Sequence, residues 1–134
     1  MARYIAFDWG KARTGIAVSD CAGIIATPHS TVATSHLNST VSKLLSEEPC
    51  AGFVVGVPGL IVGSNTDSNQ GINDFISYLE RKYPSIEIHK VDESHTSSEA
   101  MNALVSGGMK KSKRREKGSL DKVAAALILQ RFLG

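Results

Sequence analysis

The sequence predicts an α/β fold built on one mixed five-stranded sheet with helices on both faces. Three short strand-like segments follow one another within the first 32 residues, an order typical of an antiparallel meander. After them, helical and strand-like segments alternate along the chain, as they do when helices connect parallel strands. The later strand at 52–57 is a continuous apolar run, so we expect helices to cover both faces of the sheet.

The meander is expected from strands at 3–8, 15–20 and 24–32. A short loop with two basic residues, Lys11 and Arg13, joins the first strand to the second. Pro28 lies in the third strand and has no backbone N–H to donate, which favours an edge position for that strand.

The remaining elements are predicted from apolar spacing and from capping residues. In order, they are a helix at 36–48, a strand at 52–57, a helix at about 67–82, a strand at 86–93, a helix opened by a capping box at 96–99 and ended at 107–108, and a last helix capped by Ser119 that runs to about Phe132. We expect Leu120, Val123, Ala124, Leu127 and Ile128 of the last helix to face the sheet. The small side chains of 124–126 should let this helix approach the sheet closely.

Composition predicts a single domain over residues 1–134. Cys21 and Cys50 fit neither a metal-binding spacing nor a disulfide framework. No stretch approaches the roughly 20 apolar residues that cross a bilayer. We therefore expect a cytoplasmic protein with no membrane partner.

Positive charge is concentrated in one short segment. Residues 110–122 contain seven basic and two acidic residues, whereas the rest of the chain contains eight basic and eleven acidic ones. Such a segment is more often a solvated loop, but the asymmetry also suggests a polyanionic partner.

Three acidic positions coincide with the ends of predicted elements. Asp8 ends the first strand, Glu93 with Asp92 beside it ends the last strand, and Asp121 lies in the first turn of the last helix. If the first, fourth and fifth strands are parallel neighbours, their carboxyl ends meet at one rim of the sheet. We expect Asp8, Glu93 and Asp121 to meet there.

Carboxylates held close together repel one another unless a cation neutralises them, and oxygen ligands suit Mg²⁺ or Mn²⁺. Two such ions can clamp a phosphodiester and activate water, which predicts a hydrolase acting on ester bonds. Lys11 and Arg13 would then contact phosphates beside the cleaved one.

Each acidic residue also has a simpler interpretation. In this interpretation Asp8 with Gly10 simply begins a turn, Asp121 simply stabilises its helix by interacting with the helix dipole, and the pair 92–93 consists of solvated charges at a strand end. The combination of the three positions favours the metal site.

Four segments resemble the YqgF (RuvX) family of the ribonuclease H-like superfamily, whose members are described as pre-16S rRNA nucleases or as Holliday junction resolvases. They are FDWGKARTGIAVSD at 7–20, VVGVP at 54–58 followed by Gly63-Ser64, VDESHTSSEA at 91–100, and DKVAAALILQRFL at 121–133. The resemblance implies a ribonuclease H-like fold and metal-dependent cleavage of phosphodiesters. It implies Asp8, Glu93 and Asp121 as catalytic and metal-binding residues, with Asp92 the weaker member of its pair.

Two departures from the family pattern concern substrate binding. Ser94 stands where the family usually has Arg, and residues 59–72 replace a charged stretch. The residues predicted to bind nucleic acid are Lys11, Arg13, Lys110, Lys111, Lys113, Arg114, Arg115 and Lys117.

The leading hypothesis is a nuclease that processes structured RNA, with a ribosomal RNA precursor as substrate. A four-way DNA junction is the alternative substrate, and it would normally require a symmetric dimer; the chain shows no obvious dimer helix, which leaves a monomer or a weak homodimer. A second class is a nucleic-acid-binding module without catalysis. A third, a sugar kinase or actin-like ATPase, would need a second lobe that one short domain does not supply.

Overall fold

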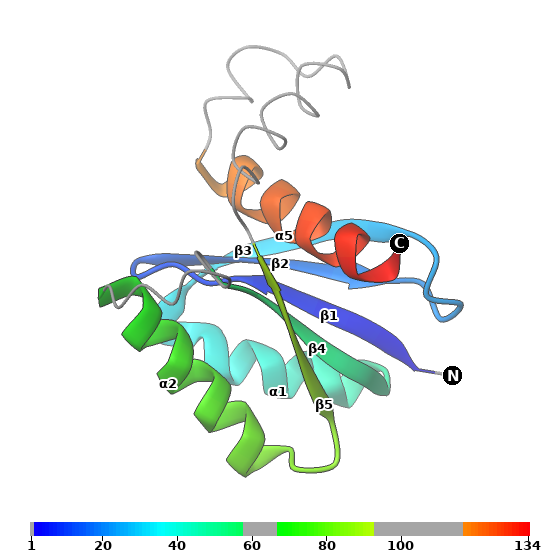
Figure 1. Ribbon diagram of the computed structural model, residues 1–134, viewed down its shortest axis with the longest axis horizontal. Coiled ribbons are helices and arrows are strands. Elements are labelled where there is room, and N and C mark those ends of the chain that lie inside the picture. Colours follow the sequence, from blue (N-terminus) through cyan, green and yellow to red (C-terminus); the bar gives the residue numbers. More distant parts are fainter. Residues whose placement is uncertain (1, 58–66, 93–116) are drawn as a thin grey trace.

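The computed structural model describes residues 2–57, 67–92 and 117–134, the side chains of 67–69 and 117–120 excepted. Figure 1 shows the element order along the chain. The elements are β1 (Arg3–Asp8), β2 (Arg13–Ser19), β3 (Ala26–Ala33), the 3₁₀ turn η1 (Thr34–His36), α1 (Leu37–Glu47), β4 (Cys50–Val57), α2 (Asp67–Lys82), β5 (Glu87–Asp92) and α5 (Lys117–Leu133).

The sheet has five strands in the order β3-β2-β1-β4-β5. β1 pairs antiparallel with β2, and β2 pairs antiparallel with β3, which is the predicted meander. β4 is parallel to both β1 and β5. β3 is an edge strand, as Pro28 predicted. The predicted mixed sheet is therefore confirmed.

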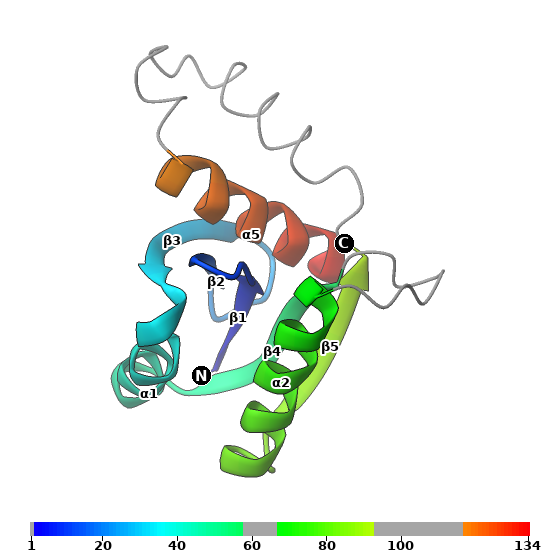
Figure 2. The same ribbon diagram turned by 90° about the vertical axis from the view of Figure 1, so that its left-hand side faces the viewer.

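Helices cover both faces of the sheet. α1 and α2 lie on one face and α5 crosses the other (Figures 1 and 2). Successive residues of a strand point to opposite faces, and β1 divides in this way: Phe7 packs with the α1 and α2 side chains, whereas Ala6 packs with α5.

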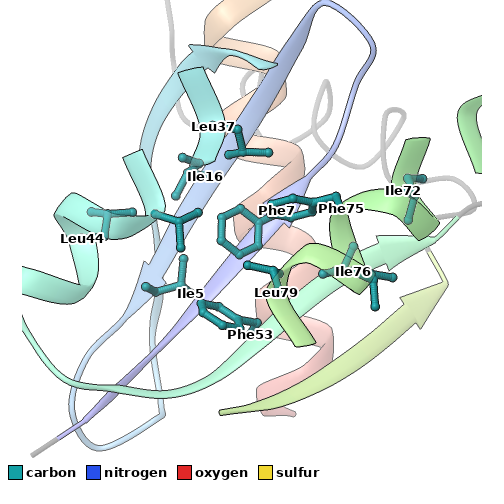
Figure 3. Packing of buried hydrophobic residues seen from close by; sticks show 12 residues of the cluster. Ile5, Phe7, Ile16, Leu37, Leu44, Phe53, Ile72, Phe75, Ile76 and Leu79 are labelled. Atoms are coloured by element: carbon teal, nitrogen blue, oxygen red, sulfur yellow. The ribbon is translucent and has the colours of Figure 1, made fainter. Parts of the chain in front are cut away.

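The α1/α2 face holds the bulky part of the core. Phe7 packs edge-on against Phe75 of α2, with ring centroids 5.1 Å apart, and lies 5.9 Å from the Phe53 ring. Figure 3 shows these rings with Leu37, Leu44, Ile72, Ile76 and Leu79 between the sheet and the two helices. Full burial of such side chains contributes about 1.5–3 kcal/mol each.

Toward the carboxyl end of β1, the α5 face is lined by small side chains. Ala6 of β1, Ala17 of β2 and Ala125 of α5 are fully buried there. Alanine leaves little side-chain volume between the layers, so the helix backbone lies close to the strands.

Three predictions about the last helix needed correction. α5 begins at Lys117, so Ser119 lies inside the helix and Asp121 follows its first turn. Ala125 and Leu129 are fully buried, whereas Val123 and Leu127 are only partly buried. Three consecutive alanines do not show which side of the helix faces the sheet, because their small side chains are compatible with either side. The contact with the sheet decides which side is buried. The predicted helix at 96–108 lies outside the described residues.

Candidate active site at the sheet rim

The carboxyl ends of three parallel strands lie at one rim of the sheet. β1 ends at Asp8, β4 at Val57 and β5 at Asp92, and all three run in the same direction. The loop 9–12 connects β1 to β2 at this rim. In α/β sheets, sites form in crevices outside the carboxyl ends of the strands.

Asp8 lies on the α5 side of the sheet. It is directly opposite Gly15 in the antiparallel pair of β1 and β2, and two residues from Ala6, which packs against α5. Side chains at positions i and i+2 of a strand share a face. The Asp8 carboxylate is therefore placed on the face where α5 lies.

Gly15 determines how close α5 comes to this position. A Cβ atom added to Gly15 would lie 2.0 Å from the backbone oxygen of Asp121 and 2.3 Å from its carbonyl carbon. No side chain fits in that space, so only glycine permits the contact. Asp8 lies beside Gly15 within the sheet and Asp121 lies over it on α5. The fold thus places two acidic residues that are more than a hundred positions apart in sequence next to the same glycine.

Arg13 pairs with Asp121 across the same contact. Its Nε donates a hydrogen bond of 2.9 Å to Asp121 Oδ2. The Arg13 side chain is 42% exposed and that of Asp121 is 23% exposed, so the pair contributes little to stability. Its structural effect is to orient one carboxylate oxygen and one guanidinium at the rim.

Thr34 holds the loop 9–12 against the sheet, and sequence reasoning did not single it out. Its hydroxyl donates to the carbonyl oxygen of Gly10, accepts from the hydroxyl of Thr14 at 2.9 Å, and its backbone N–H donates to Ala12. Thr14 is fully buried. In the sequence, the signal that could have pointed to this link is the polar Thr14 between the loop and the apolar strand at 15–20.

Asp92 is turned away from the α5 side. It is opposite Val57, which packs in the α1/α2 core, whereas its neighbour Val91 packs with α5. Its backbone oxygen accepts a 2.8 Å hydrogen bond from Nη1 of Arg131 at the end of α5. This register agrees with the expectation that Asp92 is a weaker candidate than Glu93 for a metal-binding residue.

A family model described as "RuvX: Holliday junction resolvase" matches residues 2–134. The chain belongs to the RuvX family. Two relatives named "Putative pre-16S rRNA nuclease" are similar over 99% of this chain: one from Amoebophilus asiaticus, 41% identical and covered over 94% of its length, and one from Phocaeicola vulgatus, 38% identical and covered over 96%.

The RuvX-family chain also shares its fold with a solved structure. That structure is T. thermophilus RuvC in complex with a Holliday junction substrate, at a TM-score of 0.59 and 14% sequence identity, with 100% of this chain and 97% of the other covered. The match confirms the ribonuclease H-like fold.

The other predicted site residues of this RuvX-family chain are described only in part. Lys11 is exposed on the loop 9–12, and Lys117 begins α5. Glu93, Lys110, Lys111, Lys113, Arg114 and Arg115 lie outside the described residues. Within the described ranges, no group of three or more His, Cys, Asp or Glu side chains could hold a metal ion, and no helix there is long and apolar enough to cross a membrane.

Two groups far from the predicted site have shifted pKa values. The backbone N–H groups of Ile25 and Ile24 lower the pKa of Asp20 below its usual 3.8, and they donate to its Oδ1 at 3.0 and 2.8 Å. Burial raises the pKa of the Cys50 thiol. Asp20 follows β2 and Cys50 begins β4, so both lie at the end of the sheet opposite the rim.

Proposed function

We propose that this protein is a metal-dependent nuclease that hydrolyses phosphodiester bonds in structured nucleic acid, and that its substrate is the 5′ region of pre-16S ribosomal RNA. The observation that carries the proposal is the placement of Asp8 and Asp121 on either side of Gly15 at the sheet rim. Two carboxylates in one water-accessible place are typical of a cation site.

The donor chemistry of these residues fits Mg²⁺ or Mn²⁺. Both side chains offer oxygen atoms only, which are the ligands that small divalent ions prefer in proteins. The ion pair with Arg13 engages one oxygen of Asp121 and leaves Oδ1 for a cation. When bound, the metal would activate water and neutralise charge on the phosphate, as in two-metal nucleases.

Glu93 is proposed as the third carboxylate, because it directly follows β5 in the sequence and Asp92 faces the other side of the sheet. We further propose that residues 1–134 form one nuclease domain, which the match of the family model over residues 2–134 supports.

Basic residues of the chain would hold the nucleic-acid backbone. Arg13 lies at the rim beside Asp121, and the exposed Lys11 lies on the adjacent loop. The segment 110–117 runs up to the first residue of α5 and contains six more basic residues. Contacts of this kind give sequence-tolerant, salt-sensitive affinity. We expect the Nη groups of Arg13 to bind a phosphate while its Nε remains on Asp121.

The names of the relatives favour ribosomal RNA as the substrate, and on that basis we propose that the protein acts in the cytoplasm. A Holliday junction is the second candidate, favoured by the family description and by the junction bound to the RuvC neighbour. Cutting a four-way junction symmetrically requires two sites in a dimer. We expect a monomer or weak homodimer, which suits the RNA substrate better.

The proposal is tested by offering three labelled substrates side by side: a pre-16S RNA fragment with its 5′ extension, a four-way DNA junction and plain duplex DNA. Each is incubated with Mg²⁺, with Mn²⁺ and with chelator. We expect metal-dependent cleavage of the RNA. Faster cleavage of the junction, together with a dimer by light scattering, would favour the second candidate instead.

Asp8→Asn and Asp121→Asn serve as inactive variants, and Glu47→Gln, an exposed acid at the end of α1, is the matched control. Cleavage that survives both active-site substitutions would come from a contaminating nuclease and would contradict the proposal. Tight RNA binding by the wild type without cleavage in either metal would indicate a binding module.

A further inference from the structure

A second site lies at the same rim, on the α1/α2 side of the sheet. It is a cavity of about 220 Å³ between the loop after β1, the start of α1 and the first half of α2. Its lining consists of Trp9, Thr34, Leu37, Asn38, Gly71, Asp74, Phe75 and Tyr78. Of the predicted metal-binding and phosphate-binding residues that the structure describes, none lines it.

Trp9 forms one wall, and Gly71 fixes its position. A Cβ atom on Gly71 would lie 2.1 Å from Cη2 and 2.6 Å from Cζ2 of the indole. The six-membered ring of Trp9 therefore rests directly on the backbone of α2. Trp9 is only partly buried, although it packs against the core. A large aromatic surface is thus held rigidly beside a hollow, where a flat ligand could stack on it.

The cavity and the carboxylates are connected through the loop 9–12. Trp9 directly follows Asp8, and Thr34 of the cavity wall is bonded to Gly10 and Ala12 of that loop. The loop ends at Arg13, the partner of Asp121. A nucleic-acid strand bound at Asp8 therefore needs to cross only this loop, with its exposed Lys11, to reach the cavity.

The lining indicates a particular kind of ligand. Among the described residues that line the cavity none is cationic, and the one charged residue is the exposed Asp74, so the lining does not favour a phosphate. Gln70 donates to Oδ1 of Asp74 at 2.9 Å, which leaves Oδ2 to accept from a ligand. Asn38 is exposed and can both donate and accept. The volume lies below the roughly 300–1,000 Å³ of sites for drug-sized molecules, so it suits one ring system.

We propose that this cavity binds an unpaired nucleobase of the substrate strand, next to the cleaved phosphate, and prefers a base with an exocyclic amino group. The inference rests on the proposed function. Aromatic side chains are the usual stacking platforms for unpaired bases, here Trp9 and Tyr78. A carboxylate reads the amino group of cytosine, N4, as a donor. Uracil has the same size and shape but presents an acceptor at this position, so Asp74 disfavours it.

Trp9 is the only tryptophan of the chain, so intrinsic fluorescence reports on the cavity directly. The Asp8→Asn full-length protein is titrated with eight-nucleotide oligo(C) and oligo(U) RNA. We expect oligo(C) to quench the Trp9 emission and to bind about 10-fold more tightly than oligo(U), the scale of one hydrogen bond to a charged group. Tyr78→Ala should weaken binding of both.

Asp74→Asn, made in the same background, should reduce the preference for oligo(C) to below 2-fold. Glu80→Gln is the matched control: it removes the same charge from an exposed position of the same helix, outside the cavity, and should keep the preference.

Equal affinity for the two RNAs, binding without quenching of Trp9, or a preference that persists in Asp74→Asn would each overturn the inference while leaving the nuclease proposal intact. A shift of the Trp9 indole N–H resonance with protein concentration alone would show that a second copy of the chain fills the cavity, which would also overturn it. Wild-type protein that neither binds nor cleaves any nucleic acid would instead refute the proposed function.

Discussion

The two faces of the sheet are packed in opposite ways. Against α1 and α2 the sheet presents large side chains such as Phe7 and Phe53, which interlock with rings from the helices. Against α5, near the rim, it presents Gly15, Ala6 and Ala17. The first face fills its space with side chains, whereas the second brings the helix backbone onto the strand at Gly15.

Because of this difference, one face of the sheet mainly stabilises the fold and the other mainly positions the candidate active site. Burial of large apolar groups is the main stabilising contribution to a fold of this size, and the α1/α2 face provides most of it. The α5 face holds Asp121 over Gly15, beside Asp8. Substitutions on the two faces should therefore have different consequences.

The largest effect is expected at the carboxylates. Asp8→Asn removes a charged oxygen ligand with almost no change of volume, and we expect cleavage of the pre-16S fragment to fall on the order of 1,000-fold or more. Thermal unfolding followed by circular dichroism should give an unchanged or slightly higher Tm. A drop of the Tm by 10 °C or more would show that Asp8 belongs to the stability of the fold instead.

A large effect on stability is expected on the α1/α2 face. Phe53→Ala leaves a cavity beside Phe7 and should lower the free energy of unfolding by about 3–5 kcal/mol, as measured in urea. Activity at a temperature where the variant is still folded should change less than 3-fold. Loss of activity from fully folded protein would contradict the separation of the two faces.

Gly15→Ala tests the close approach of α5. The added methyl group meets the Asp121 carbonyl at 2.0 Å, so helix and strand must move apart. We expect cleavage to fall about 100-fold, the effect of a misplacement of about 1 Å, with about 1–3 kcal/mol lost in stability.

Gly52→Ala is the matched control for this substitution. Gly52 lies on the same face, toward the opposite end, where its Cβ would meet Cε1 at the edge of the Tyr4 ring at 3.0 Å. A side-chain ring can shift, so activity should be retained. Equal activity of the two variants would show that the α5 contact does not set the site.

A smaller effect is expected from the basic segment before α5. Replacing Lys113, Arg114 and Arg115 with Gln should weaken RNA binding about 10-fold at moderate salt and reduce the salt slope of log K by about 2. The change is measured by fluorescence anisotropy at several salt concentrations. Gln at Lys43, Arg81 and Lys90, exposed positions on the α1/α2 side, is the control. An unchanged slope would place the segment outside the binding surface.

The smallest effect is expected at Asp20, at the end of the sheet away from the rim. Its lowered pKa means that the charged form stabilises the fold above about pH 5, and that this contribution is lost as the pH falls below 3.8. Asp20→Asn should therefore lower the Tm slightly at pH 7, and this difference should shrink as the pH falls below 3.8, with cleavage unaffected. A Tm difference that stays constant as the pH falls through this range would contradict this explanation.

The element order and the antiparallel meander could be predicted from local sequence signals alone. These signals are the short apolar runs of β1, β2 and β4 and the proline of β3, and each depends on local chemistry. The acidic residue at the end of β1 could also be predicted, because strand ends are visible in the sequence.

Only the tertiary structure decided which distant residues meet. The run of three alanines fits either side of α5, and the start of that helix at Lys117 carries no strong capping signal. The contact of Gly15 with Asp121 and the position of Trp9 on Gly71 each depend on the exact approach of two layers. Such approaches are set by the summed packing of the whole core, which no short stretch of sequence encodes.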